Sequence, residues 1–248
     1  MINQNKFFNI PGNIDAPLWR YIDTKKLESL LETGCLHFTR SDLLGDEHEG
    51  STTKLTIEER KNFYRGASEH TIKFGFPKLG KDWGKCTYIS CWHCSKNESL
   101  AMWELYLPIK NGSNGVAIKT SISRLKKYII ETERDFYLNP VQYLDYDTDT
   151  VSEGNAFIPF FIKRDIHQHE REFRILVANL EDLPAVSAGT KDPIRGIFIP
   201  VILDKLIEKI IISPFANPAT VIYIERLLKK YHLEEKLEDS TTKRTPEF

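Results

Sequence analysis

Short strand-like segments and segments with helical spacing of apolar residues follow one another along this chain, and none is long enough to dominate the fold. The strand-like segments, rich in β-branched and aromatic residues, cover residues 18–22, 35–39, 86–92, 115–120, 141–146, 170–178, 196–201 and 209–213. Helices are expected from Asp23 or Thr24 to Gly34 and over 56–74, 98–106, 121–130 and 219–231, the second beginning with a capping box of Thr56 and Glu59. We therefore predict an α+β fold, a single domain whose central sheet is mostly antiparallel, continuous or split, and flanked by helices.

The sequence contains no internal repeat and no Pro/Gly/Ser-rich linker that would divide it. Residues 1–16 are expected to form a flexible N-terminal segment, and residues 17–233 to form the single α+β domain. Residues 234–248 mix both charges with Ser and Thr, which is typical of a frayed C-terminal tail.

Composition excludes several classes of protein. The chain has 248 residues, 41% of them hydrophobic, which is enough for a sizeable core. Its 34 basic and 35 acidic residues give a net charge of -1, so the global basic field of a non-specific polyanion binder is absent. No apolar run approaches the roughly 20 residues of a membrane span, and the N-terminus does not resemble a signal peptide. We expect a cytoplasmic protein without a membrane partner.

Cysteines do not predict a metal site. In the cytoplasm the four cysteines should be reduced thiols. The motif from Cys91 to Cys94 supplies two ligands where zinc needs four, and Cys86 would point to the opposite strand face from Cys91. No metal is expected.

Acidic and basic residues alternate at the start of the segment 170–178. The two-residue period of a strand would place Glu170, Glu172 and Arg174 on one face. Adjacent carboxylates can raise the pKa of one of them, while the guanidinium keeps the other ionised, and this suits general-base work or stabilisation of a cation. These three residues are the candidate catalytic group. The alternative is a solvated strand face held by ion pairs.

A strand followed by a helix over residues 88–106 carries a second cluster. Its members share one strand face (Tyr88, Ser90, Trp92) or one helix stripe (Ser99, Met102, Trp103, Tyr106). Large aromatics at helical spacing usually pack in the interior. The functional alternative is an aromatic wall with a hydroxyl that receives a flat heterocycle.

Two further features, the loop from Asp46 to Gly50 and Arg20, each have more than one interpretation. The loop from Asp46 to Gly50, with His48 between carboxylates, could bind a divalent ion or contact a substrate, or could be an exposed acidic turn. Arg20 lies between Trp19 and Tyr21 on an early strand, where it needs a carboxylate or a phosphate as partner.

The order of these motifs resembles a bacterial family known as domain of unknown function 2971. The resemblance covers residues 18–244 and rests on Trp19-Arg20-Tyr21, Lys26-Leu27, Gly34 to Phe38, Asp46 to Gly50, Ser90 to His93, Glu98-Ser99, Met102-Trp103, Tyr106, Gly115 to Ile118, Tyr143 and Glu170 to Arg174. The family occurs among mobile-element and phage-defence genes. The resemblance therefore implies a toxin or phage-defence effector, with an antitoxin or defence-system protein as partner.

The layout is also similar to that of ADP-ribosyltransferases with an Arg–Ser–Glu motif set. This resemblance implies that NAD is the substrate, that Arg20 binds its pyrophosphate or nicotinamide ribose, and that Ser90 supports the nicotinamide. Glu172 would bind the ribose 2′-hydroxyl and stabilise the oxocarbenium ion, and Glu170 would activate the acceptor. The implied NAD-binding set is Arg20, Tyr21, Ser90, Trp92, Ser99, Trp103 and Tyr106. The sequence departs from the family pattern after Ser90, where Cys91 and Trp92 replace Thr-Ser.

Three functional hypotheses follow. The first is an NAD-consuming ADP-ribosyltransferase-like enzyme, whose partners are a small-molecule nucleotide and a macromolecular acceptor that the sequence does not identify. The second is an acid/base or metal-assisted hydrolase, such as a nuclease, that uses Asp46, His48, Glu170 and Glu172. The third is a non-catalytic module that binds a nucleotide or a protein and uses Glu170 and Arg174 structurally.

Overall fold

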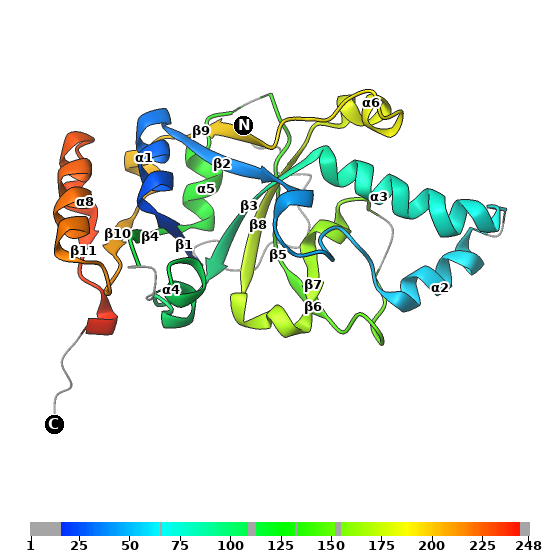
Figure 1. Cartoon of the computed structure of the whole chain (residues 1–248), viewed down its shortest axis with the longest axis horizontal. Coiled ribbons are helices and arrows are strands. Elements are labelled where there is room, and N and C mark those ends of the chain that lie inside the picture. The colour runs from blue at the N-terminus through cyan, green and yellow to red at the C-terminus, as the bar shows by residue number, and fades with distance from the viewer. Residues whose placement is uncertain (1–15, 65, 109–112, 132, 152–154, 244–248) are drawn as a thin grey trace. The chain divides into compact units, whose positions relative to one another are not determined.

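A computed structural model describes residues 16–64, 66–108, 113–131, 133–151 and 155–243 (Figure 1). These residues form two compact units interleaved along the chain. The β8 unit holds residues 38–90 and 133–197, and the β4 unit holds the described residues of 16–37, 91–132 and 198–243. Whether residues 17–233 fold as a single domain is not tested by this division, so the single domain stays a prediction. Residues 1–15 of the expected flexible segment lie outside the described residues.

The β4 unit is built on strands in the order β11-β10-β4-β1, and β1 also pairs with the end of β3. These are β1 (Pro17–Asp23), β3 (Thr87–Cys94), β4 (Gly115–Ser121), β10 (Lys209–Ile212) and β11 (Leu237–Glu238). Strands β1 and β4 pair over their whole length, from Pro17 opposite Ser121 to Asp23 opposite Gly115. Only the short β11 runs parallel to its neighbour among the described pairs of this unit. Its helices are α1 (Thr24–Thr33), α4 (Leu100–Tyr106), α5 (Ile122–Tyr128), α7 (Leu203–Leu206) and α8 (Pro218–Lys230).

Helix α1 shows how local sequence positions these elements. The Asp23 side chain accepts a hydrogen bond from the backbone N–H of Lys26, and Gly34 ends the helix with a φ of 64°. Leu27, Leu30 and Leu31 are buried, as their spacing predicted. This helix therefore confirms the expected caps and apolar face.

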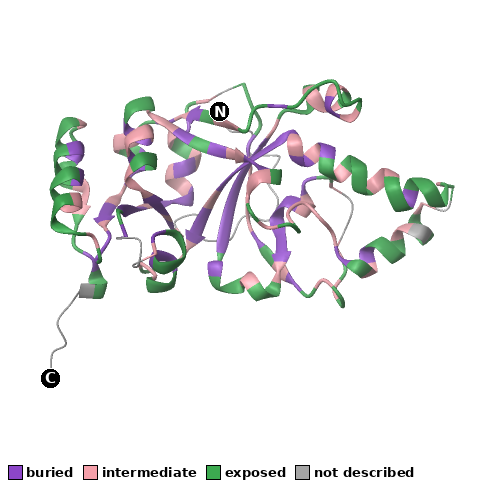
Figure 2. Ribbon diagram, viewed as in Figure 1, coloured by how far each residue is buried: buried purple, intermediate pink, exposed green. Residues whose placement is uncertain are grey.

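The β8 unit is built around β8 (Glu172–Ala178), which pairs with β5 (Tyr137–Pro140) and with β3. Strand β2 (Cys35–Arg40) also pairs with β3, and β6 (Gln142–Leu144) runs parallel to β7 (Ile162–Arg164). The helices of this unit are α2 (Lys54–Phe63), the π-helix η3 (Thr71–Gly75), α3 (Phe76–Lys85) and α6 (Leu183–Ser187). Its short 3-10 helices are η2 (Ser41–Leu43), η5 (Ile158–Phe161), η6 (Asp165–Glu170) and η7 (Leu180–Asp182). Figure 2 shows β8 almost entirely buried, so any charge on it must find a partner inside the protein.

Strands β2, β3 and β9 (Gly196–Pro200) each begin in one unit and end in the other. Most of the described strand pairs are antiparallel, and helices contact the strands in the β4 unit. The predicted α+β class with a mostly antiparallel sheet flanked by helices is thus confirmed.

The expected helix over 56–74 is wrong in its bounds and its cap. Helix α2 begins after Thr53, whose hydroxyl accepts from the backbone N–H of Thr56, and it ends at Phe63. Helix α3 was not predicted, because Pro77, Gly80 and Gly84 lower helix propensity. Pro77 lies in the first turn of α3, where its missing N–H leaves no partner unsatisfied.

Two other expectations differ from the structure. The segment 141–146 contributes only the short β6, and β5 before it carries the pairing with β8. Residues 234–243, expected to be frayed, contain η8 (Glu234–Lys236), β11 and η9 (Thr241–Lys243), while residues 244–248 lie outside the described residues. Pairing of Leu237 with Ile210 orders this part of the tail.

Candidate active site

The segment 162–174 brings a dense set of charges into the β8 unit. Strand β7 supplies Lys163 and Arg164, and η6 follows with His167 and Glu170. Arg171 then adopts a left-handed conformation with a φ of 45°, and β8 starts at Glu172. The chain therefore turns sharply between the two carboxylates.

This turn corrects the expected strand over 170–178. Glu170 ends a 3-10 helix and does not share the strand face with Glu172 and Arg174, because the backbone of Arg171 breaks the two-residue period. Glu172 and Arg174 do lie on one face, with Arg174 Nε donating to Glu172 Oε2 at 2.7 Å. Glu170 rejoins them through Lys163, whose Nζ lies 2.9 Å from Glu170 Oε2 and 2.8 Å from Glu172 Oε1.

Glu172 is a buried carboxylate that stays ionised. Its side chain is 5% exposed, and Lys163 and Arg174 engage its two oxygens. Burial alone would raise the pKa of Glu172, but Arg174 and Lys163 outweigh it and hold the pKa well below its ordinary value. Burial likewise would lower the pKa of Lys163, and Glu172 with Glu170 raises it instead. The carboxylate is thus fixed in both charge and orientation.

The loop 46–50, which precedes α2, joins this network through Glu49. Glu49 accepts from both terminal nitrogens of Arg174, with 3.0 Å between Nη2 and Oε2, and Arg174 Nη1 also donates to the carbonyl of Phe160 at 2.7 Å. Burial raises the pKa of Glu49 more than Arg174 lowers it. Gly50 has a φ of 70°, and a Cβ there would lie 2.8 Å from the Phe160 ring, so the loop passes close to η5.

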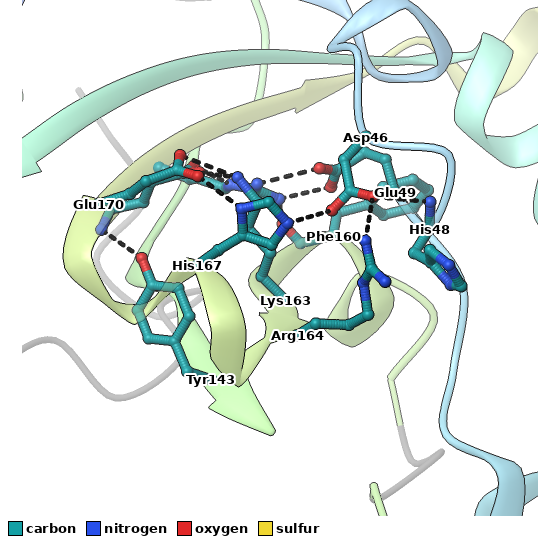
Figure 3. A network of polar contacts seen from close by, with 11 residues as sticks. Asp46, His48, Glu49, Tyr143, Phe160, Lys163, Arg164, His167 and Glu170 are labelled. Carbon is teal, nitrogen blue, oxygen red and sulfur yellow. Dashed lines mark hydrogen bonds and ion pairs between the residues drawn. The ribbon is translucent and has the colours of Figure 1, made fainter. Parts of the chain in front are cut away.

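The network continues from Glu170 to His167, Asp46 and Arg164 (Figure 3). His167 Nδ1 lies 2.8 Å from Glu170 Oε1, and His167 Nε2 lies 3.7 Å from Asp46 Oδ2. Arg164 Nη2 is 3.7 Å from the other oxygen of Asp46. The phenol of Tyr143 accepts from the backbone N–H of Glu172 at 2.7 Å, and burial raises the pKa of this phenol to about 12.

Sequence reasoning missed Lys163 and His167 in this network. A signal was present: residues 163–172 hold charged or histidine side chains at most positions, directly after the apolar run 157–162. The loop 46–50 was recognised, and the structure joins its Asp46 and Glu49 to the strand cluster. His48 instead presents its ring to Tyr146 at 5.9 Å.

Most of the residues assigned to NAD lie in the β4 unit. The guanidinium of Arg20 lies 5.5 Å from the centroid of the Trp92 ring and donates to the carbonyl of His37 at 3.0 Å. Burial lowers the pKa of Arg20, and nearby Cys91 and Tyr106 oppose that effect. Burial also lowers the pKa of His37, as do the charges of Arg20 and Lys26. Cations such as Arg20 and Lys26 suit an anion.

Tyr21, Ser99 and Trp103 form a second group in the β4 unit. Ser99 caps α4, and its backbone N–H donates to the Tyr21 phenol at 2.7 Å. The rings of Tyr21 and Trp103 lie 4.9 Å apart, and Trp103 is fully buried. The interior position predicted for Trp103 is confirmed, whereas that for Tyr106 is wrong, because Tyr106 is 47% exposed.

The structure thus places the predicted residues in two groups. Ser90, Glu170, Glu172 and Arg174 belong to the β8 unit, where Ser90 is fully buried on β3. Arg20, Tyr21, Trp92, Ser99, Trp103 and Tyr106 belong to the β4 unit. A shared NAD site formed by both groups stays a prediction.

Over the described part of the chain, no group of three or more His, Cys, Asp or Glu residues is arranged to hold a metal ion. The four cysteines are free thiols. Within the same ranges, no helix combines the length and apolar character that crossing a membrane requires.

Comparison with known proteins leaves the function to be argued from these residues. No protein-family model matches the sequence, and no curated protein matches it. The resemblance to family 2971 therefore stays a prediction. A solved structure, DarT from Thermus sp. 2.9 in complex with ADP-ribosylated single-stranded DNA, aligns over 91% of this chain and 93% of its own, with a TM-score of 0.35 and 12% identity. A similarity at this level carries no argument about fold or activity.

Proposed function

We propose that this chain is an NAD-consuming enzyme of the ADP-ribosyltransferase type in which Glu172 stabilises the cationic transition state. The observation that carries the proposal is the buried, ionised carboxylate of Glu172, held in one orientation by Lys163 and Arg174. Loss of nicotinamide leaves positive charge on the ribose, and a carboxylate already in place stabilises that charge without reorganisation. The order of Arg20, Ser90 and Glu172 along the sequence supports the same reaction.

Arg20 and Trp92 support an NAD-binding role for the β4 unit. The guanidinium packs on the indole, and the charges of Arg20 and Lys26 both act on His37. Such a group can bind pyrophosphate oxygens, and an aromatic face can stack on a flat ring. We assign Arg20 to binding of the NAD phosphates. The aromatic ring that stacks on a flat ring of NAD is that of Trp92 or of the exposed Tyr106.

The test uses NAD labelled in the nicotinamide ring and, separately, in the adenylate phosphate. The purified full chain is incubated with each label in the presence of water alone, protein, DNA or RNA, and nicotinamide release and label transfer are measured. We expect release by the wild type and a decrease of about 100- to 1,000-fold for Glu172→Gln, the usual effect of removing one electrostatic stabiliser.

Glu208→Gln is the matched control. Glu208 also pairs with a lysine, Lys119, at 2.6 Å, but it lies in the β4 unit and is 30% exposed, so Glu208→Gln removes a Glu–Lys ion pair from outside the network. It should release nicotinamide at the wild-type rate. A wild type that releases no more nicotinamide than boiled protein rejects the proposal.

A non-catalytic module is the second candidate, favoured by one observation. Both oxygens of Glu172 and both oxygens of Glu49 already have cationic or N–H partners inside the protein. If the network is purely structural, Glu172→Gln lowers stability in a protein that never consumes NAD. Urea unfolding measured beside the NAD assay separates the two candidates.

The proposed cellular role is that of a toxin or phage-defence effector with an antitoxin or defence-system protein as partner. An NAD-consuming effector should arrest growth when its expression is induced in a bacterial host, and Glu172→Gln should relieve that arrest. Equal growth arrest by both proteins at equal expression would contradict this role.

A further inference from the structure

His167 is held in one orientation between two carboxylates. Its Nδ1 contacts Glu170 at 2.8 Å, and its Nε2 faces Asp46 at 3.7 Å (Figure 3). A carboxylate only accepts hydrogen bonds, so Nδ1 carries the hydrogen toward Glu170. Nε2 makes no hydrogen bond with Asp46 and holds a lone pair when the ring is neutral. A carboxylate that orients a histidine in this way is the arrangement of a general base.

Glu170 is poorly placed to act as the base itself. Its Oε1 is engaged by His167 and its Oε2 by Lys163 at 2.9 Å, and it is largely buried. His167 is 26% exposed and Glu170 is 10% exposed, although the Nε2 atom of His167 is covered. Glu170 therefore serves as the positioning residue for His167.

Two buried polar atoms beside Asp46 have no hydrogen-bond partner within the described ranges. They are His167 Nε2 and Arg164 Nε. Buried nitrogens without partners are rare in native proteins and indicate a position that a water or ligand atom completes. A hydroxyl oxygen could accept from Arg164 Nε–H while donating its own hydrogen to His167 Nε2. Both atoms are covered in this arrangement, and the Arg164 side chain is 34% exposed and lies 3.7 Å from Asp46.

We infer that His167 is the general base that takes the proton from the acceptor hydroxyl, with Glu170 orienting it and Arg164 holding the acceptor oxygen. The inference rests on the proposed function. In the step, the acceptor oxygen bonds to C1′ of the ribose as the bond from C1′ to the nicotinamide nitrogen breaks. The electron pair of that bond stays on nicotinamide, which leaves neutral, and the acceptor proton passes to His167 Nε2.

The surroundings stabilise His167 after it gains the proton. The imidazolium lies between the carboxylates of Glu170 and Asp46, and the cations Lys163 and Arg164 lie behind these carboxylates. His169 also lies near this ring, with ring centroids 6.5 Å apart.

The experiment compares His167→Gln with His169→Gln, the neighbouring histidine on the same 3-10 helix. Nicotinamide release and label transfer from NAD are measured against pH, with the acceptor that the wild type uses or with water. We expect His167→Gln to lower the maximal rate about 100- to 10,000-fold with little change in KM for NAD, and to lose the acidic limb of the pH profile. His169→Gln should keep both the rate and the limb. Added imidazole should restore part of the rate to His167→Ala.

The outcomes separate the two hypotheses. If the wild type releases no nicotinamide, the proposed function fails. If the wild type is active and His167→Gln keeps its rate and pH profile, the general-base role of His167 is overturned while the proposed function stands. Should the variants fail to fold, ¹⁵N NMR of the histidine-labelled wild type still decides the geometry: a hydrogen on Nε2 and none on Nδ1 would contradict the inference.

Discussion

Arg174 is the residue that joins the loop 46–50 to strand β8. It is 1% exposed and uses its three nitrogens on Glu172, Glu49 and the carbonyl of Phe160. A planar guanidinium can satisfy these acceptors at once, whereas a lysine ammonium is a single point charge. The position therefore demands arginine for geometric reasons as well as for charge.

Arg174→Lys should lower the free energy of unfolding by about 3 kcal/mol, because at least one buried carboxylate loses its partner. Urea unfolding followed by fluorescence measures the change. Arg171→Lys, at an exposed position next to the network, should change stability by less than about 0.5 kcal/mol. Equal values for the two variants would mean that the bidentate contacts with Glu49 do not form.

The ionisation of Glu172 predicts a pH dependence with a definite sign. Its pKa is lowered in the folded protein, so the stabilisation that the carboxylate provides is present above its unfolded pKa of about 4.3 and is lost as pH falls through the folded value. The wild type should exceed Glu172→Gln by about 3 kcal/mol near pH 7, and the difference should shrink below about pH 4.3.

Urea unfolding of both proteins between pH 3 and 7 tests this sign. The raised pKa of Glu49 acts in the opposite direction, and Glu172→Gln also removes the charge of Glu172 that helps to raise it. A difference that grows on acidification would contradict the assigned ionisation.

At the scale of elements, the backbone conformation of one residue between η6 and β8 determines how the carboxylates of the site are arranged. The left-handed Arg171 turns the chain so that Glu170 and Glu172 approach Lys163 from two elements instead of one strand face. Without that turn, the period of two would place the carboxylates side by side on the strand face.

Helix α1 offers a test of a single cap. Asp23→Ala should lower the free energy of unfolding by about 1 kcal/mol, because the N–H of Lys26 loses its acceptor. Asp23→Asn keeps a side-chain oxygen and should retain most of the stability. Thermal and urea unfolding measure these changes. If both variants unfold with the same free energy as the wild type, the cap does not contribute to stability.

At the scale of the whole molecule, each unit is assembled from segments far apart in the sequence. Glu98 in the β4 unit is an example, since its carboxylate accepts from Trp103 Nε1, from the Ser240 hydroxyl and from the backbone N–H of Thr242. Burial would raise the pKa of Glu98, but these hydrogen bonds and that of Thr241 lower it. One side chain thus anchors the C-terminal segment.

Glu98→Ala should speed backbone hydrogen exchange in residues 237–243, because Ser240 and Thr242 lose their common acceptor. Hydrogen exchange with mass spectrometry measures this, with Glu104→Ala on α4 as the control. Unchanged exchange in the Glu98 variant would show that pairing of β11 with β10 alone orders the segment.

The sequence by itself determined the elements whose signals are local. Strands β1, β3, β4 and β10 and the caps of α1 and α5 follow from alternation, from helical spacing and from side chains that bond a neighbouring N–H. The pairing of Glu172 with Arg174 could also be predicted, because the two lie two residues apart on one strand.

Only the tertiary structure decided which distant groups complete the charge network. Lys163 and His167 reach Glu172 and Glu170 through the turn at Arg171, and Glu49 reaches Arg174 across 125 residues of sequence. Local periodicity does not encode such contacts. They form because burial of β8 makes an unpaired charge costly, so the fold must bring a partner from wherever the chain supplies one.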